Sequence, residues 1–239
     1  MAAKLKTAVV GATGYSGFEL TRILLRHPLV ATPALLSRQG EGNGAANLAD
    51  LFPALSGNGG YPLKPLSWSA LKEQGVELLF LAIPHEASRS LVPEAVAHGL
   101  RVIDLSGAWR IRAAQHRAVY GFKDEGSATA AEFTEKAVYG LPELHSDTIR
   151  TATVVANPGC YATAMQLAIA PLKDGIAAPP ACFGVSGCSG AGTAPSDKND
   201  PQKLHDNLMP YALVDHLHER EATRQLGMPV EFMPHGAPH

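Results

Sequence analysis

The sequence predicts an α/β fold with a Rossmann-like dinucleotide-binding domain and a smaller second domain, and three observations lead to this prediction. Apolar runs of strand length alternate with stretches of helical periodicity, which is typical of a parallel sheet. A glycine-rich stretch, GATGYSG, stands between the first such run and the first helical stretch, where dinucleotide-binding domains hold phosphates. The pattern changes near Asn157, where the second domain is expected to begin.

The first three predicted elements form one βαβ unit. Residues 7–10 are a run with β-branched side chains that ends in glycine, so a strand is expected there. Residues 17–27 place four apolar side chains at helical spacing and stop before Pro28, which predicts a helix. Residues 31–36 again have the composition of a strand.

Two further strands are predicted over residues 78–83 and 101–105, with a helix over residues 85–99 between them. Both runs are mainly apolar, which suits strands covered on both faces in a parallel sheet. Residues 37–67 and 108–136 are rich in Gly, Ala, Ser and charged residues, and they are expected to be irregular connections.

The predicted domain boundary lies at the end of a last strand, residues 151–156, and divides the chain into a first domain of residues 1–155 and a second of residues 156–239. The second domain is expected to be α+β. Its elements would be a helix over 160–172, a strand from Ala181 into a glycine-rich loop, and a helix around 213–226.

The charge and the cysteine content exclude several classes of function. The net charge is −2 and no run of five basic residues occurs, so neither nucleic acid nor an anionic membrane is expected as a partner. Three cysteines without zinc or disulfide spacing predict no bound metal and a reducing, cytoplasmic location. The amino terminus lacks the pattern of a signal peptide, and no stretch reaches the ~20 apolar residues of a membrane span.

The GATGYSG stretch predicts a phosphate-binding turn. Gly11 would make the tight turn, Gly14 would let the backbone approach a pyrophosphate, and Gly17 would let the helix pack closely on the strand. N–H groups at the helix start would bind the phosphates. The residues expected to contact the cofactor are Gly11, Thr13, Gly14, Tyr15, Ser16 and Gly17. The first spacing is GxxG rather than GxG, so a glycine-rich turn without a ligand is the alternative.

Ser37 and Arg38, at the end of the second predicted strand, indicate NADP rather than NAD. NAD sites usually have an acidic residue there, about twenty residues after the glycine motif, to bind the ribose hydroxyls. An arginine instead suits a 2′-phosphate. The alternative is an ordinary surface arginine.

Cys160, in the stretch ANPGCYATA, is the candidate nucleophile. Asn157 could cap the following helix and Pro158 could occupy its first turn, which would place the thiol at the positive end of the helix dipole, where a thiolate is stabilised. The alternative is a buried, inert cysteine, and that is the interpretation we favour for Cys182 and Cys188.

Six stretches together resemble one protein family, that of the N-acetyl-γ-glutamyl-phosphate reductases of arginine biosynthesis, within the wider semialdehyde dehydrogenase group. The resemblance covers nearly the whole chain. The stretches are GATGYSG (11–17), FLAIPH (80–85), DLSGAWR (104–110), YGLPEL (139–144), ANPGCYATA (156–164) and GVSGCSGAG (184–192).

The resemblance implies a role for several of these residues. Cys160 corresponds to the family's nucleophile and His216, the first histidine of an HxHxxE pattern, to its acid-base group, with His218 as the runner-up. Residues implied to orient groups or to contact the substrate are Arg110, Asn157, Tyr211 and Glu221; residues implied to contact the cofactor are Pro84, Ser189 and Gly190. Family members also self-associate, so a homo-oligomer is expected.

The chain departs from the family pattern at two kinds of position. Leu217 and Thr193 stand where the family usually has arginine, so cations that could bind an acidic substrate are missing. The final residues, VEFMPHGAPH, resemble the start of a family strand that normally continues into further sequence, so the second domain is expected to be incomplete at its carboxyl end.

The expected reaction is a two-step acyl reduction. The Cys160 thiolate would attack an acyl phosphate, and the resulting thioester would accept hydride from NADPH. His216, titrating near neutrality, would supply a proton, and Arg110 would contact a substrate anion. The alternatives are another acyl phosphate (aspartyl or N-acetylaminoadipyl), an NADP-binding scaffold without turnover, and a Cys-His hydrolase.

Overall fold

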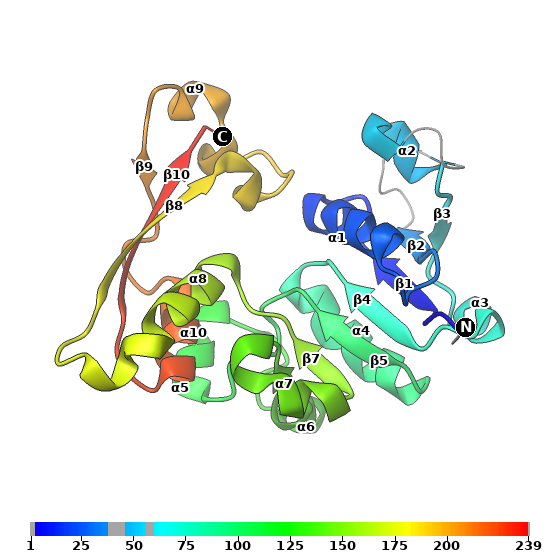
Figure 1. The fold of residues 1–239 in the computed structure, drawn as a ribbon, viewed down its shortest axis with the longest axis horizontal. Helices are drawn as coiled ribbons and strands as arrows, with labels where there is room; N and C mark the ends of the chain where they lie inside the picture. The colour runs from blue at the N-terminus through cyan, green and yellow to red at the C-terminus, as the bar shows by residue number, and fades with distance from the viewer. Residues whose placement is uncertain (1–2, 38–45, 56–59, 239) are drawn as a thin grey trace.

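Seven parallel strands form the larger sheet of the computed structural model, which describes residues 3–37, 46–55 and 60–238 (Figure 1). The strand order is β3-β2-β1-β4-β5-β7-β6, so the chain reverses its direction of winding between β1 and β4. Ligands of such sheets bind at the carboxyl ends of the strands beside this switch point. The strands are β1 (Thr7–Val10), β2 (Ala34–Ser37), β3 (Leu63–Pro65), β4 (Leu78–Leu81), β5 (Arg101–Asp104), β6 (Val138–Tyr139) and β7 (Val154–Ala156).

Helices cover both faces of this sheet, because successive strand residues point to opposite sides. Val9 and Phe80, which are paired across β1 and β4, face a core closed by α1 and α2. Val10 and Leu81 face the other core, closed by α3, α4 and α6. The helices of this part are α1 (Tyr15–Arg26), α2 (Leu48–Leu51), α3 (Trp68–Gln74), α4 (His85–Ala97), α5 (Ala114–Arg117), α6 (Ala128–Lys136) and α7 (Pro142–Thr151), with 3₁₀ turns η1 (Pro53–Leu55) and η2 (Ala118–Tyr120). The predicted parallel sheet is confirmed.

The two segments predicted to be irregular contain regular elements, so that prediction was wrong. Residues 60–67 include β3, and residues 108–136 include α5 and α6. The helix α6 is capped by the Ser127 hydroxyl, which accepts a hydrogen bond from the Ala130 N–H, and it buries Phe133. Its alanine-rich sequence has few large apolar residues, which explains why the periodicity was weak.

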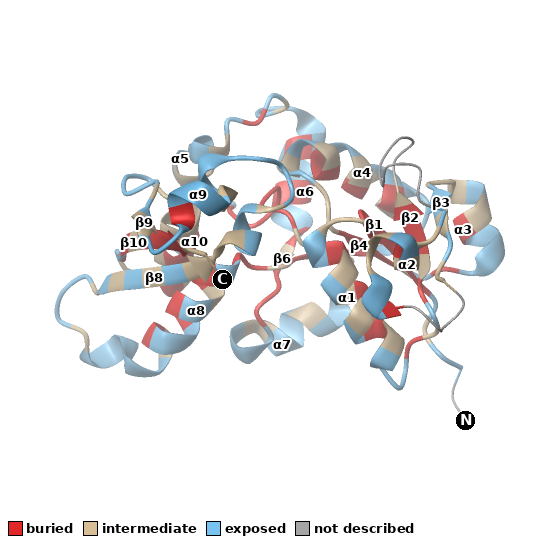
Figure 2. Cartoon of the chain, turned by 90° about the horizontal axis from the view of Figure 1, so that it is seen from above, coloured by how far each residue is buried: buried red, intermediate tan, exposed pale blue. Residues whose placement is uncertain are grey.

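The second part of the chain has its own small sheet, of order β8-β10-β9, at the far end of the molecule from β3 (Figure 1). Strand β10 pairs parallel with β8 and antiparallel with β9. Figure 2 shows β8 as a mixture of exposed and intermediate residues, with none buried. The elements are α8 (Cys160–Ile169), η3 (Ala170–Gly175), β8 (Ala181–Gly187), η4 (Cys188–Ala191), η5 (Asp197–Asn199), α9 (Pro201–Leu204), β9 (Met209–Pro210), α10 (Leu217–Leu226) and β10 (Glu231–Ala237).

The helices α8 and α10 pack together with β10 in a separate core that includes Met165, Leu226 and Phe232. The predicted helix around 213–226 begins later than expected, at Leu217. Ala212 and Asp215 both have positive φ angles, of 41° and 55°, which a right-handed helix does not accommodate. Strand β7 ends at Ala156, one residue past the predicted domain boundary, and that boundary stays a prediction.

Candidate active site

The glycine-rich turn joins β1 to α1 as the sequence predicts. Gly11 has a φ of +83°, and a Cβ there would lie 2.2 Å from the carbonyl oxygen of Ala82, the residue directly after the neighbouring strand β4. A Cβ on Gly17 would lie 2.1 Å from the Gly11 carbonyl oxygen. The tight turn and the close packing of helix on strand are therefore confirmed. Helix α1 has no side-chain cap and no acidic residue in its first turn, which leaves backbone N–H groups for an anion.

The other predicted cofactor contacts lie at the same edge of the sheet. Ser37 is the last residue of β2, and the Gly11 N–H donates to the carbonyl of the preceding Leu36 at 3.0 Å. Pro84 stands directly before α4. Arg38 lies outside the described residues, so its predicted contact with a 2′-phosphate stays a prediction. Thr13 and Ser16 lie in the turn and first helical residues beside Tyr15.

A cavity of about 660 Å³ joins this edge to the second part of the chain. Tyr15 of α1 lines it from one side, and Ser189 and Asn199 line it from the other. The predicted cofactor residue Ser189 is thus brought together with the glycine-rich turn, although it follows Tyr15 by more than 170 residues.

Cys160 is the first residue of α8 and is exposed to solvent. It lines a second cavity, of about 410 Å³, which we call the Cys160 cavity. The cavity is lined by His85, Cys160, Tyr161, Ser186, Gly187, Gly190, Ala191, Lys198, Tyr211, His216, Leu217, His218 and Gly236. The 3₁₀ turn η4 lies between the two cavities, since Ser189 lines the first and Gly190 the second. This arrangement places a thiol, three imidazoles and two phenols around one space.

His216 is held as the cap of α10. Its Nδ1 accepts the backbone N–H of His218 at 3.0 Å, so a neutral ring carries its proton on Nε2. Burial, then the nearby His218 and Lys198, lowers the pKa of His216 from 6.5 to about 4. The expectation that this imidazole titrates near neutrality is therefore wrong, because its burial favours the neutral form.

His218 packs over the start of α8. A Cβ on Gly159 would lie 2.2 Å from His218 Nε2 and 2.9 Å from a guanidinium nitrogen of Arg110. Only glycine at position 159 therefore allows this imidazole to approach the residue before Cys160. Burial, then Arg110 and His85, lowers the pKa of His218 to about 4. Both histidines line the cavity, and the preference for His216 over His218 as the acid-base group stays a prediction.

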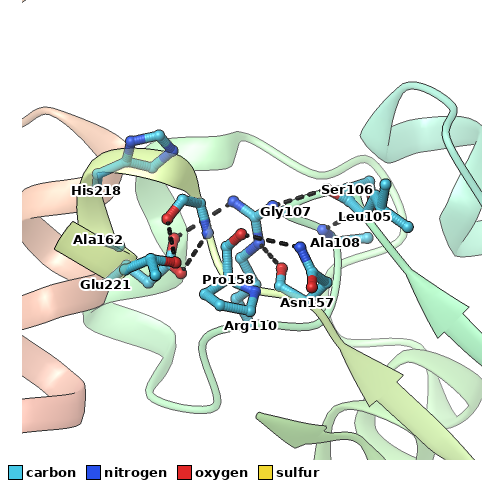
Figure 3. A network of polar contacts seen from close by, with 12 residues as sticks. Leu105, Ser106, Gly107, Ala108, Arg110, Asn157, Pro158, Ala162, His218 and Glu221 are labelled. Carbon is cyan, nitrogen blue, oxygen red and sulfur yellow. Dashed lines mark hydrogen bonds and ion pairs between the residues drawn. The ribbon is translucent and has the colours of Figure 1, made fainter. Parts of the chain in front are cut away.

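Glu221 connects three parts of the site, and Figure 3 shows it beside Arg110 and the start of α8. Its carboxylate accepts hydrogen bonds from the Gly159 N–H at 2.9 Å, from the Tyr139 hydroxyl at 2.6 Å and from Arg110 at 3.4 Å. The side chain is fully buried, and it does not line the Cys160 cavity. Of the two roles left open for Glu221, the geometry favours orientation of α8 over contact with the substrate.

Arg110 is also occupied by the protein. Its side chain donates to the carbonyls of Asn157 and Leu105, both at 2.7 Å, and forms the ion pair with Glu221. The residue is buried. The guanidinium thus stabilises the turn between β7 and α8. Its contact with a substrate anion stays a prediction.

Asn157 does not cap α8, so that prediction was wrong. The residue in the capping position is Gly159, and the Asn157 side chain donates to the Pro158 carbonyl at 3.2 Å instead. The Glu221 carboxylate, 62 residues away, accepts the N–H that a local cap would have taken. Contact of Asn157 with the substrate stays a prediction.

Tyr211 lines the cavity, and burial raises the pKa of its hydroxyl.

Two residues that sequence reasoning missed also line the Cys160 cavity. His85 starts α4, and its Nδ1 accepts the Gly107 N–H at 2.8 Å; its place directly after a buried strand in FLAIPH was a signal that could have found it. Lys198 lies in η5, within a polar segment whose composition is that of an ordinary solvated loop.

Within the described ranges, no cluster of three or more His, Cys, Asp or Glu side chains could hold a metal ion, and no helix there is both long and apolar enough to cross a membrane.

Comparison with family models assigns both parts of the chain. Residues 6–152 match the model described as semialdehyde dehydrogenase, NAD binding domain, and residues 160–239 match the dimerisation domain of the same family. The chain is 43% identical to an N-acetyl-gamma-glutamyl-phosphate reductase of Xylella fastidiosa and 42% identical to one of Xanthomonas campestris, over 97% of its own length. It spans 62% and 65% of the lengths of these relatives.

Solved structures with the same fold are more distant in sequence. Aspartate semialdehyde dehydrogenase II of Vibrio cholerae, complexed with ASA, aligns with a TM-score of 0.70 at 17% identity, covering 99% of this chain and 71% of the other. The aspartate semialdehyde dehydrogenase of Candida albicans, solved with NADP, aligns with a TM-score of 0.65 at 13% identity, covering 99% and 68%. These likenesses show the fold.

Proposed function

The chain belongs to the semialdehyde dehydrogenase family, and from that premise we propose that it reduces N-acetyl-γ-glutamyl phosphate to N-acetylglutamate semialdehyde with NADPH, releasing phosphate. The observation that carries the proposal is the position of Cys160, exposed at the first residue of α8, on a cavity shared with His216 and His218. The names of the relatives, at 42–44% identity, support this choice of substrate.

The glycine-rich turn fits a bound dinucleotide. Gly11 and Gly17 leave no room for a Cβ, and the uncapped start of α1 offers N–H groups to a pyrophosphate. NADPH would supply the hydride when bound at this edge of the sheet. The proposal favours NADP over NAD because Ser37, the last residue of β2, and Arg38, the next residue in the sequence, stand where NAD sites usually have an acidic residue.

Cys160 would act as the nucleophile. Its thiolate would attack the acyl carbon, forming a carbon–sulfur bond while the bond to the phosphate oxygen breaks and phosphate leaves. The N–H groups of the first turn of α8 have no helical acceptor, and those after Gly159 are free to stabilise the oxygen that becomes negative. Glu221 and Arg110 fix the position of this helix end.

Hydride transfer to the thioester carbon would put a negative charge on the acyl oxygen, and the carbon–sulfur bond would then break to give the aldehyde and the Cys160 thiolate. The imidazole of His216 would hold that oxygen by sharing its proton between these two events. Its Nδ1 is occupied by the His218 N–H, so the Nε2–H is the group that can donate to the substrate oxygen. A neutral imidazole can hold that oxygen by a hydrogen bond. An anionic substrate next to the ring would raise its pKa toward the range of a proton donor.

The proposal includes a homo-oligomer and a cytoplasmic location. Residues 160–239 match the dimerisation domain of the family, which supports self-association. All three cysteines are free thiols, which suits a reducing compartment.

Phosphate-dependent reduction of NADP by the full chain, with N-acetylglutamate semialdehyde as substrate, tests the proposal in the reverse direction. We expect turnover that requires phosphate and that is faster with this aldehyde than with aspartate semialdehyde. Faster turnover of aspartate semialdehyde would contradict the choice of substrate. Binding of NADP without turnover of either aldehyde would instead indicate a cofactor-binding scaffold.

A further inference from the structure

The Cys160 cavity has one cationic side chain besides its imidazoles among the described residues, that of Lys198. The imidazoles of His216 and His218 are neutral at pH 7, since burial lowers the pKa of each to about 4. Arg110 is turned away into hydrogen bonds with the protein. Burial, then the nearby Arg110, also lowers the pKa of His85, the third imidazole of the cavity. Among the described residues that line this space, a fixed positive charge therefore comes from Lys198 alone.

The loop that carries Lys198 is held by its own hydrogen bonds. The Asn199 side chain donates to the carbonyls of Gly192 and Ala194, at 2.9 and 2.8 Å, and accepts the Ser196 N–H at 2.7 Å. The carboxylate of Asp197, the residue before Lys198, forms an ion pair with the Lys203 ammonium at 2.6 Å. The Lys198 ammonium is thus left available, and it lies 4.7 Å from the centroid of the Tyr211 ring, within the range of a cation–π contact.

The proposed substrate needs such a charge. An N-acetylated acyl phosphate has no ammonium group and carries a carboxylate and a phosphoryl group, so its charge is entirely negative at neutral pH. Leu217 lines the same cavity and Thr193 lines the adjoining one, and neither offers a cation. Resting on the proposed function, we infer that Lys198 binds an anionic oxygen group of the substrate beside the Tyr211 ring and that it sets the preference of the site for acidic acyl substrates.

Two measurements test this inference, one with turnover and one without. In the oxidative direction, Lys198→Met is expected to raise KM for either the semialdehyde or inorganic phosphate by roughly 10- to 100-fold, with a smaller change in kcat. A raised KM for the aldehyde identifies the carboxylate as the bound group, and a raised KM for phosphate identifies the phosphoryl group. Lys198→Arg is expected to restore most of the loss, and Lys173→Met, an equal change of charge at an exposed site of η3, is the control.

The second measurement compares alkylation of Cys160 by iodoacetate, an anion, and by iodoacetamide, which is neutral. In both reactions sulfur forms a bond to carbon as iodide leaves, and mass spectrometry of the peptide gives the rate at this thiol. A nearby cation favours the anionic reagent, so the ratio of the two rates is expected to fall by about 3-fold or more in Lys198→Met and to hold in Lys198→Arg and Lys173→Met.

The alkylation ratio decides the inference whether or not the chain turns over. An unchanged ratio in Lys198→Met overturns it, whatever the kinetic constants show. A reduced ratio in a chain that turns over neither aldehyde supports the anion site and counts against the proposed function alone.

Discussion

The carboxylate of Glu221, on α10, accepts a hydrogen bond from the backbone N–H of Gly159, the residue directly before the exposed thiol of Cys160. The second domain thereby holds the start of α8 with a side chain from 62 residues further along the chain. The same carboxylate binds Arg110 and Tyr139 from the first domain. One buried group therefore links the two parts of the molecule beside the proposed nucleophile.

Glu221→Gln is expected to lower the free energy of unfolding by about 3–5 kcal/mol, because the change leaves the buried Arg110 charge without its partner. It should also slow turnover, since the start of α8 loses its charged acceptor. Urea denaturation and steady-state kinetics measure the two effects. Glu231→Gln, on the exposed side of β10, is the control, and a Glu221 variant as stable as this control would contradict the role of the linkage.

Gly159→Ala is expected to reduce kcat by at least about 100-fold while NADP affinity changes little, because a methyl group would displace the His218 ring from the start of α8. Gly175→Ala, where a Cβ meets nothing within 4 Å, is the matched control. Full activity of Gly159→Ala would show that the close approach of His218 has no part in catalysis.

Gly11→Ala is expected to abolish tight NADPH binding, since the new Cβ would overlap the Ala82 carbonyl oxygen at a positive φ. Gly99 has a similar φ of +81° but open space around it, so Gly99→Ala separates backbone strain from the clash. Strain alone costs about 1–2 kcal/mol, and Gly99→Ala should keep its NADPH affinity. Fluorescence titration of the two variants compares them, and equal affinities would contradict the phosphate-binding turn.

Acid is expected to destabilise the protein between pH 6.5 and about 4. The pKa of His218 is lowered from 6.5 to about 4 in the folded chain, so the unfolded state binds the proton first and stability falls as pH falls through this window. Protonation of His218 should account for roughly 1–3 kcal/mol of the unfolding free energy lost over this window. The less buried His216 should account for less. Urea denaturation at pH 7 and pH 5 measures how much unfolding free energy is lost between the two pH values. This loss should be smaller for His218→Gln than for the wild type or for His205→Gln, a change at an exposed position. An equal loss in all three proteins would contradict the conclusion that the His218 imidazole is buried in its neutral form.

Much of the fold follows from local sequence patterns, and the parts that do not are those fixed by distant contacts. The strands β1 and β4 are apolar or β-branched throughout, β5 has an apolar centre, and Gly11 marks the turn, so each was predictable. The short strand β3 and the alanine-rich helix α6 have weak periodicity and depend on packing against the sheet.

The site divides in the same way. Recognisable motifs contain Cys160, His216 and Glu221. The capping of α8 was wrongly assigned to the nearby Asn157, because the sequence does not show which distant carboxylate contacts the start of this helix. Lys198 reaches the cavity only through the loop that follows η4, and no local pattern distinguishes it from a surface lysine. The lowered pKa of His216 is also a product of tertiary burial.

Central to this account is a covalent bond between Cys160 and the acyl group, and a rapid-mixing experiment without phosphate tests it most directly. With N-acetylglutamate semialdehyde and NADP, the wild type should release about one equivalent of NADPH in a burst and retain the acyl group on the Cys160 peptide, because the thioester has no acceptor. Cys160→Ser should bind NADP normally and show neither the burst nor the adduct. Phosphate-dependent turnover by Cys160→Ser at the wild-type rate, or an acyl group found on another residue, would contradict the account.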